Sequence, residues 1–142
     1  MAALLVALTV PAFAVAAAVA WVRVRYLVVT VRGPSMEPTL LSGDRVLARR
    51  AGLGQVRAGD IVVLGAPGRA ADGIIKRAVA VPGDPVPRAS VPALAGVAEA
   101  TVPAGKLVIV GDGVQSSDSR QRGYADGTQV IGVMVRRLAA GR

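Results

Sequence analysis

Gly-Pro-Ser-Met-Glu-Pro-Thr-Leu-Leu-Ser-Gly-Asp, residues 33–44, is the stretch around which the expected fold is arranged. Gly33 and two prolines interrupt it too often for a helix. It follows the β-branched run 27–31, which predicts a strand. Ser35 would therefore lie just past a strand end, on a stiff backbone from which a nucleophilic hydroxyl can face a cleft. The alternative is that Ser35 only hydrogen-bonds a turn.

The composition limits the chemistry in which this serine could take part. The 142-residue chain has room for one modest domain, and its aromatic content of 3% leaves a core of Val, Leu, Ile and Ala. It contains no cysteine and no histidine. Disulfides and the usual sulfur-rich zinc sites are therefore excluded, and a Ser-His-Asp triad cannot be built from this chain. A base for Ser35 would have to be Lys, Asp, Glu or Tyr.

The basic residues that give the net charge of +8 all lie after residue 22. A basic balance can indicate nucleic acid or an anionic membrane as the partner. The arginines are scattered and aromatic side chains are nearly absent, so we expect no nucleic acid and interpret the charge as a solvated face beside a membrane. Only two of the 17 basic residues are lysines, Lys76 and Lys106, and a lysine, unlike an arginine, can lose its proton when buried.

Residues 1–22 carry no charged side chain. As a helix they would be roughly 30 Å long, enough to cross the apolar core of a bilayer. We expect a transmembrane anchor, with a cleaved signal peptide or a buried soluble helix as the alternatives. Trp21 and Tyr26 lie near one end, where amphipathic rings prefer the headgroup region.

From residue 23 to 142 the pattern is one of short β-rich runs separated by turns, which predicts a single mostly β domain. The expected strands are 27–31, 44–48, 60–64, 74–81, 106–110 and 130–137. The Pro- and Ala-rich segment 85–105 is expected to be a surface connection. Four Gly-Asp pairs indicate turns, and because their spacing does not resemble a calcium loop we expect no metal site.

Lys76 lies in the predicted strand 74–81 among Ile, Ala and Val side chains that would exclude water from an ammonium group. Burial lowers the pKa of a lysine, and a neutral amine beside a serine hydroxyl can take its proton. Successive strand residues face opposite ways, so either Lys76 or Arg77 points inward, and the alternative is a solvated Lys76. The segment 111–123 holds three of the six serines, and such a loop can support a lysine amine or simply be solvated.

Together and in this order, these segments closely resemble the bacterial type I signal peptidases, serine proteases with a Ser-Lys dyad. The matching pieces are Gly-Pro-Ser-Met-Glu-Pro-Thr-Leu at 33–40, Gly-Asp at 43–44, Gly-Asp-Ile-Val at 59–62, Lys-Arg-Ala-Val-Ala-Val-Pro-Gly-Asp at 76–84 and Ser-Ser-Asp-Ser-Arg at 116–120. With the apolar helix, the resemblance spans nearly the whole chain. It implies a small, signal-peptidase-like antiparallel β domain behind one N-terminal transmembrane helix, with no cofactor.

The resemblance also implies a role for each matching residue. Ser35 would be the nucleophile, and Lys76 would be the general base, first for Ser35 and then for the deacylating water. The backbone at Ser35 and Gly33 would supply the oxyanion hole. Ser116 would orient the lysine amine. A supporting ion pair is expected from Asp118 and Arg120, near Arg77.

In that family the substrate lies extended against strand edges. The matching edges are the residues just before Ser35 and those from Asp72 to Lys76, where small pockets would select small residues, typically Ala, at the first and third positions before the cut. The residues assigned to substrate binding are Val31, Arg32, Gly33, Met36, Gly73, Ile74 and Ile75. The chain departs from the family where Gly33 replaces a serine of some members, where Gly113 replaces an asparagine, and where the segment before Lys106 is short.

We therefore expect a membrane-anchored serine endopeptidase that cleaves signal or leader peptides of the Ala-x-Ala type through an acyl-enzyme. Its partners would be the lipid bilayer and either secreted preproteins or one dedicated leader-bearing precursor. The domain would lie on the extracytoplasmic face of the cell membrane, although the arginines after the helix favour the cytoplasm under the positive-inside rule. The rival interpretations are a Ser-Lys autoprotease of the repressor-cleaving type and an inactive basic β-module that binds membrane or nucleic acid.

Overall fold

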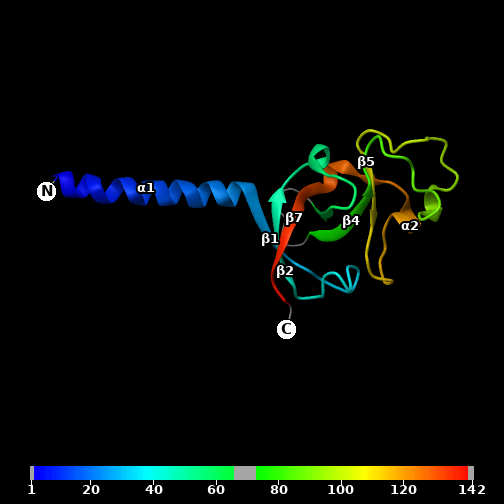
Figure 1. The fold of residues 1–142 in the computed structure, drawn as a ribbon, viewed down its shortest axis with the longest axis horizontal. Coiled ribbons are helices and arrows are strands. Elements are labelled where there is room, and N and C mark those ends of the chain that lie inside the picture. Colours follow the sequence, from blue (N-terminus) through cyan, green and yellow to red (C-terminus); the bar gives the residue numbers. More distant parts are fainter. Residues whose placement is uncertain (1, 66–72, 141–142) are drawn as a thin grey trace.

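The computed structural model describes residues 2–65 and 73–140, with side chains from residue 11 onward. A long helix, α1 (Ala2–Arg25), precedes a β-rich domain and extends away from it as a single rod (Figure 1). Every residue of α1 from 11 to 25 is exposed. The helix continues past the predicted boundary at residue 22, so that Arg23 and Arg25 lie in its last turn. Within the described residues, no helix reaches the length and hydropathy that crossing a membrane requires.

The described part of the domain forms one seven-stranded sheet in which all paired neighbours are antiparallel. The order is β1-β2-β7-β3-β4-β5-β6. The strands are β1 (Tyr26–Thr30), β2 (Arg45–Arg50), β3 (Ile61–Leu64), β4 (Ile74–Ala80), β5 (Lys106–Val110), β6 (Ala125–Asp126) and β7 (Val130–Ala139). The predicted mostly β, antiparallel fold is confirmed. The two-residue strand β6 was not predicted.

Short helical turns fill several of the connections. They are η1 (Leu53–Gln55), η3 (Pro92–Leu94), α2 (Ser119–Arg122) and η4 (Gly127–Gln129). The turn α2 forms within the polar segment that was expected to be a loop, because the Asp118 side chain accepts the Arg120 N–H and caps it. Asp118 is thereby fixed at the start of α2, close to the end of β5.

Residues before and after Ser35 in the sequence are buried and attach its loop to the hydrophobic core. Val31, which precedes this loop, is buried, and so are Met36 and Leu40, which follow the serine. These three side chains belong to one apolar cluster with β1, β2, β3 and β4. Burial of residues this size is worth about 1.5–3 kcal/mol each. The serine is therefore presented by a loop whose flanks are part of the hydrophobic core.

The segment 85–105, predicted as a surface connection, lies outside the main sheet but contributes to the core. It buries Val86, Val91, Leu94 and Val102 against the ends of β4 and β5. A single bridge between Pro85 and Thr101 closes its base. The prediction missed this cluster because the prolines of the segment interrupt any regular hydrophobic period.

Candidate active site

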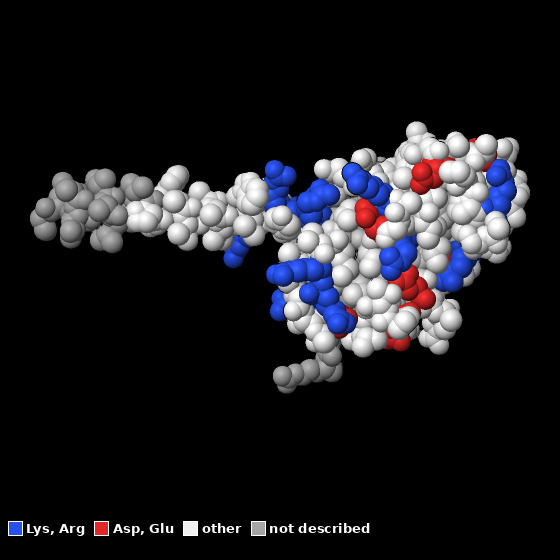
Figure 2. All heavy atoms as spheres, in the orientation of Figure 1, with Lys and Arg blue, Asp and Glu red and all other residues white. Residues whose placement is uncertain are grey.

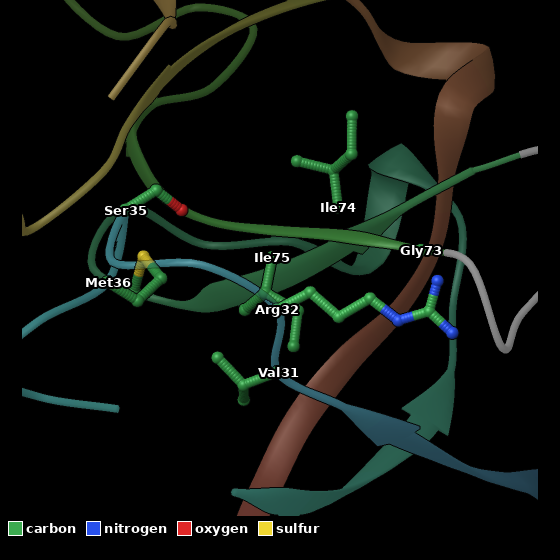
Figure 3. Close-up of a pocket in the computed structure, with 7 residues that line it drawn as sticks. All are labelled: Val31, Arg32, Ser35, Met36, Gly73, Ile74 and Ile75. Carbon is green, nitrogen blue, oxygen red and sulfur yellow. The ribbon is translucent and has the colours of Figure 1, made fainter. Parts of the chain in front are cut away.

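A pocket of about 230 Å³ opens beside Ser35. Its lining consists of Val31, Arg32, Ser35, Met36, Gly73, Ile74 and Ile75. The first four come from the loop that follows β1, and the last three from the start of β4 and the residue before it. The Ser35 hydroxyl points into the space between these two segments (Figure 3). A peptide bound in this pocket would therefore lie beside the Ser35 hydroxyl.

The pocket contains six of the seven residues that were predicted to bind substrate. Gly33 is the exception, because it does not line the pocket. Its N–H donates to Ser42 Oγ at 3.2 Å, so this amide is already engaged. Asp72, at the predicted edge before Lys76, lies outside the described residues. The assignment of these residues to substrate binding stays a prediction.

β4 places Lys76 on the inner side of the sheet. Lys76 is 5% exposed, whereas the side chain of Arg77, on the opposite face, is 32% exposed. Lys76 Nζ donates to Ser116 Oγ at 2.6 Å. Burial lowers the pKa of Lys76, the negative charge of Asp118 partly opposes this, and the positive charges of Arg120 and Arg122 reinforce it. The amine is thus closer to neutrality than a solvated lysine.

Next to Ser116, an ion pair joins the buried carboxylate of Asp118 to the partly exposed guanidinium of Arg120. Arg120 Nη2 lies 2.8 Å from Asp118 Oδ2, and the same carboxylate accepts the Gly111 N–H at 2.8 Å. Burial opposes ionisation of Asp118, but the hydrogen bonds from Arg120, Gly111 and Ser116 outweigh it and hold the pKa of Asp118 well below its usual range. The segment 116–120 is therefore rigidly attached to the end of β5, which fixes Ser116 beneath the lysine amine.

Arg77 does not belong to that ion pair. Its guanidinium is bidentate to Asp112, with Nε–Oδ1 at 2.8 Å and Nη2–Oδ2 at 2.6 Å, and the Thr39 hydroxyl donates to Asp112 Oδ2 at 2.6 Å. This hydrogen bonding lowers the pKa of Asp112. The network ties the Ser35 loop, through Thr39, to β4 and to the loop after β5.

Sequence reasoning gave no role to Asp112 or Thr39. Thr39 lies within the matching piece 33–40, and Asp112 is one of the Gly-Asp pairs that were interpreted as turns. The signal that could have identified Asp112 is the arginine next to Lys76, because a partly buried guanidinium needs a carboxylate partner.

Ser35 and the Lys76–Ser116 pair meet across Gly111. A Cβ atom added to Gly111 would collide with Ser116 Oγ and with the carbonyl oxygen of Ser35. The Ser35 carbonyl also accepts the Gly113 N–H at 2.9 Å. Within the described residues, however, Lys76 makes no hydrogen bond to Ser35, and it lines a different pocket of about 260 Å³, which shares Ile74 with the first. Catalytic hydrogen bonds of this kind often tighten only when substrate is bound.

The backbone N–H of Ser35 donates no hydrogen bond to any other described residue. A free amide beside a nucleophile is the donor that an oxyanion hole needs. No group of three or more acidic, histidine or cysteine side chains that could hold a metal ion occurs in the described residues 2–65 and 73–140.

A pocketed serine with a free amide, and a buried lysine nearby, are the groups that a serine hydrolase without histidine requires. Comparison with known proteins identifies the family: residues 3–92 match the family described as "Signal peptidase, peptidase S26", and the chain belongs to it. This match includes Ser35 and Lys76 but ends before Ser116.

The chain is also similar to "Mitochondrial inner membrane protease subunit 1" of Mus musculus. The two are 35% identical over 99 residues, which are 68% of this chain and 59% of that relative. The chain thus spans less than two thirds of the length of the curated relative that it matches. The predicted resemblance to type I signal peptidases is confirmed at the level of the family.

Proposed function

We propose that this protein is a serine endopeptidase that cleaves signal or leader peptides, with Ser35 as nucleophile and Lys76 as general base. The observation that carries the proposal is the state of Lys76. Its amine is buried, its pKa is lowered, and it is hydrogen-bonded to a serine that adjoins the Ser35 backbone across Gly111. A structural lysine would gain nothing from losing access to water, whereas a base at neutral pH requires it.

The reaction would proceed in two halves. As Ser35 Oγ attacks the scissile carbonyl, its proton passes to Lys76 Nζ, and the negative charge on the carbonyl oxygen is stabilised by the Ser35 N–H. The ammonium then protonates the leaving amine, which departs and leaves an ester on Ser35. In the second half, Lys76 takes a proton from water, the resulting hydroxide attacks the ester, and the ammonium returns the proton to Ser35.

The pocket beside Ser35 favours small residues before the cut. Part of its lining consists of Val31, Met36 and Ile75, three buried apolar side chains. At about 230 Å³ it is smaller than the 300–1,000 Å³ of a typical ligand site. These dimensions support the Ala-x-Ala type of substrate, carried either by secreted preproteins or by one dedicated precursor.

We further infer that α1 anchors the β domain, residues 23–142, to a membrane. Among the described side chains of the helix, residues 11–25, Phe13 is 78% and Trp21 56% exposed, and no apolar side chain packs into the domain core. Basic side chains gather where the helix joins the domain (Figure 2), and they include Arg23 and Arg25. Basic side chains at the end of a membrane helix are attracted to anionic lipid headgroups. A leader-cleaving role would place the domain on the extracytoplasmic face.

The dyad is tested with the full chain and a preprotein that carries an Ala-x-Ala site. Ser35→Ala and Lys76→Ala should each abolish cleavage while leaving the fold intact. The matched controls are Ser90→Ala and Lys106→Ala, because Ser90 is exposed, Lys106 is partly exposed, and neither residue lines the pocket. Cleavage that persists in either dyad variant would refute the proposal.

The anchor is tested separately. The domain should be digested by a protease added to intact cells, and it should remain with the membrane after an alkaline wash. Digestion only after the cells are opened would place the domain in the cytoplasm and would favour the positive-inside rule over the secretory role.

A further inference from the structure

A second hollow, of about 450 Å³, adjoins the Ser35 loop. It is formed by Pro34, Glu37 and Pro38 of that loop and by residues 112–115, which follow β5. It shares no residue with the pocket into which the Ser35 hydroxyl points. We call it the leaving-side pocket. The Ser35 loop therefore separates two hollows, and the nucleophile lies between them.

The leaving-side pocket carries one uncompensated negative charge. The charge of Asp112 is balanced by the bidentate Arg77, and Thr39 donates a further hydrogen bond to it. Glu37, by contrast, is half-buried, and its carboxylate makes no hydrogen bond or ion pair within the described part of the chain. The prolines and Val114, which is 97% exposed, give the rest of the wall an apolar character. On a chain of net charge +8, this is a local site of opposite sign.

We propose that the leaving-side pocket binds the part of the substrate that follows the scissile bond, and that Glu37 selects a lysine or arginine side chain there. This inference rests on the proposed function. A substrate whose residues before the cut fill the pocket beside Ser35 must continue past the serine in the other direction. The backbone at that point is the loop 112–115, whose Gly113 N–H already donates to the Ser35 carbonyl.

The shape and charge of the pocket fit such a side chain. Its aliphatic stem would lie along the two prolines and Val114, while the cationic head reaches the Glu37 carboxylate. A partly exposed ion pair of this kind is worth up to about 1 kcal/mol, which corresponds to a preference of about three- to five-fold in kcat/KM. The preference should weaken with added salt because the site is open to solvent.

The test uses the full chain and three sets of Ala-x-Ala peptides that differ at a single position after the cut. Lysine, norleucine or glutamate is placed in turn at the first, second and third positions. At one of these positions the lysine peptide should be cleaved about three- to five-fold faster than the norleucine peptide, and the glutamate peptide more slowly than both. Equal rates for all three residues at every position would overturn the inference. Failure to cleave any peptide would instead refute the proposed function.

Variants at Glu37 identify the carboxylate responsible. Glu37→Gln should bring the lysine-to-norleucine ratio to about one, and Glu37→Lys should make glutamate the preferred residue. The matched control is Glu99→Gln, which removes an exposed carboxylate that does not line the pocket and should leave the ratio unchanged. A ratio that survives Glu37→Gln, or that Glu99→Gln abolishes equally, would show that the preference comes from the overall charge and not from this pocket.

Discussion

Replacing Gly111 with alanine should disable the site through one methyl group. The added Cβ would meet two parts of the machinery at once, the Ser116 hydroxyl and the Ser35 carbonyl. The second of these is backbone, held by the Gly113 N–H at 2.9 Å, so it cannot move aside without displacing Ser35, the proposed nucleophile. Gly111 is itself fixed by its N–H to Asp118 at 2.8 Å. The collision therefore cannot be avoided without moving the Ser35 backbone or Gly111 itself.

The size of the effect follows from these contacts. Forcing a methyl group into a packed site costs about 1–3 kcal/mol. For a domain of about 120 residues with an unfolding entropy of about 2.1 cal/mol/K per residue, this lowers Tm by about 4–12 °C. A displacement of about 1 Å at the nucleophile can reduce kcat by about 100-fold. The activity should therefore fall far more than the stability alone would explain.

The assay compares Gly111→Ala with Gly96→Ala by thermal melting and by peptide cleavage at a temperature where both are folded. A Cβ atom at Gly96 would meet nothing within 4 Å, and this glycine has no special backbone conformation, so its variant should match the wild type in both measurements. Wild-type kcat and Tm in Gly111→Ala would show that Ser35 and Ser116 are not neighbours across this glycine, and the proposed base would lose its link to the nucleophile.

Three further outcomes are expected from the same contacts. Lys76 must be neutral to act as a base, and burial lowers its pKa. The acylation rate should therefore rise with pH, with a midpoint below the pKa of an ordinary lysine, and a rate that does not change with pH there would exclude an amine base. Lys76→Met should abolish cleavage yet raise the free energy of unfolding at neutral pH by about 1 kcal/mol or more. This gain should shrink as pH rises, because the folded wild-type protein loses the buried charge of Lys76 at a lower pH than the unfolded chain does; a destabilised Met variant in urea unfolding would contradict the burial argument. Asp118→Asn should lower the free energy of unfolding by about 2–4 kcal/mol at neutral pH, because the depressed pKa of Asp118 stabilises the folded state at any pH above the ordinary pKa of a carboxyl group. This loss should become smaller as the pH falls toward about 3, and a loss that is independent of pH would mean that the carboxylate charge is not involved.

The strands were predictable because the turns between them are built from local chemistry. In three of the Gly-Asp pairs the aspartate carboxylate accepts the N–H of the residue three positions earlier, which is Leu41, Arg57 or Val81. Such turns need no distant partner, so the sequence alone identifies them. The fourth pair was misjudged because Asp112 turns away from its own loop to Arg77, 35 residues earlier in the chain.

The orientation of Lys76 could not be predicted in the same way. Alternation along a strand requires that Lys76 and Arg77 face opposite sides, but it does not say which side is the inner one. That choice depends on β4 pairing with β3 on one side and β5 on the other, and on the polar segment that brings Ser116 to the inner face. The family resemblance indicated the outcome, whereas the local pattern left it open.

The alternation of Lys76 and Arg77 on β4 also makes the proposed role of Lys76 as a base sensitive to insertions and deletions in this strand. If one residue were deleted from the strand ahead of Lys76 while the pairing on either side stayed in place, the guanidinium would move to the inner face. It would keep a positive charge there but could not give up its proton, so the site would retain a cation and lose the proposed base. Deleting two residues would restore the facing. We expect insertions and deletions that survive in this strand to come in pairs.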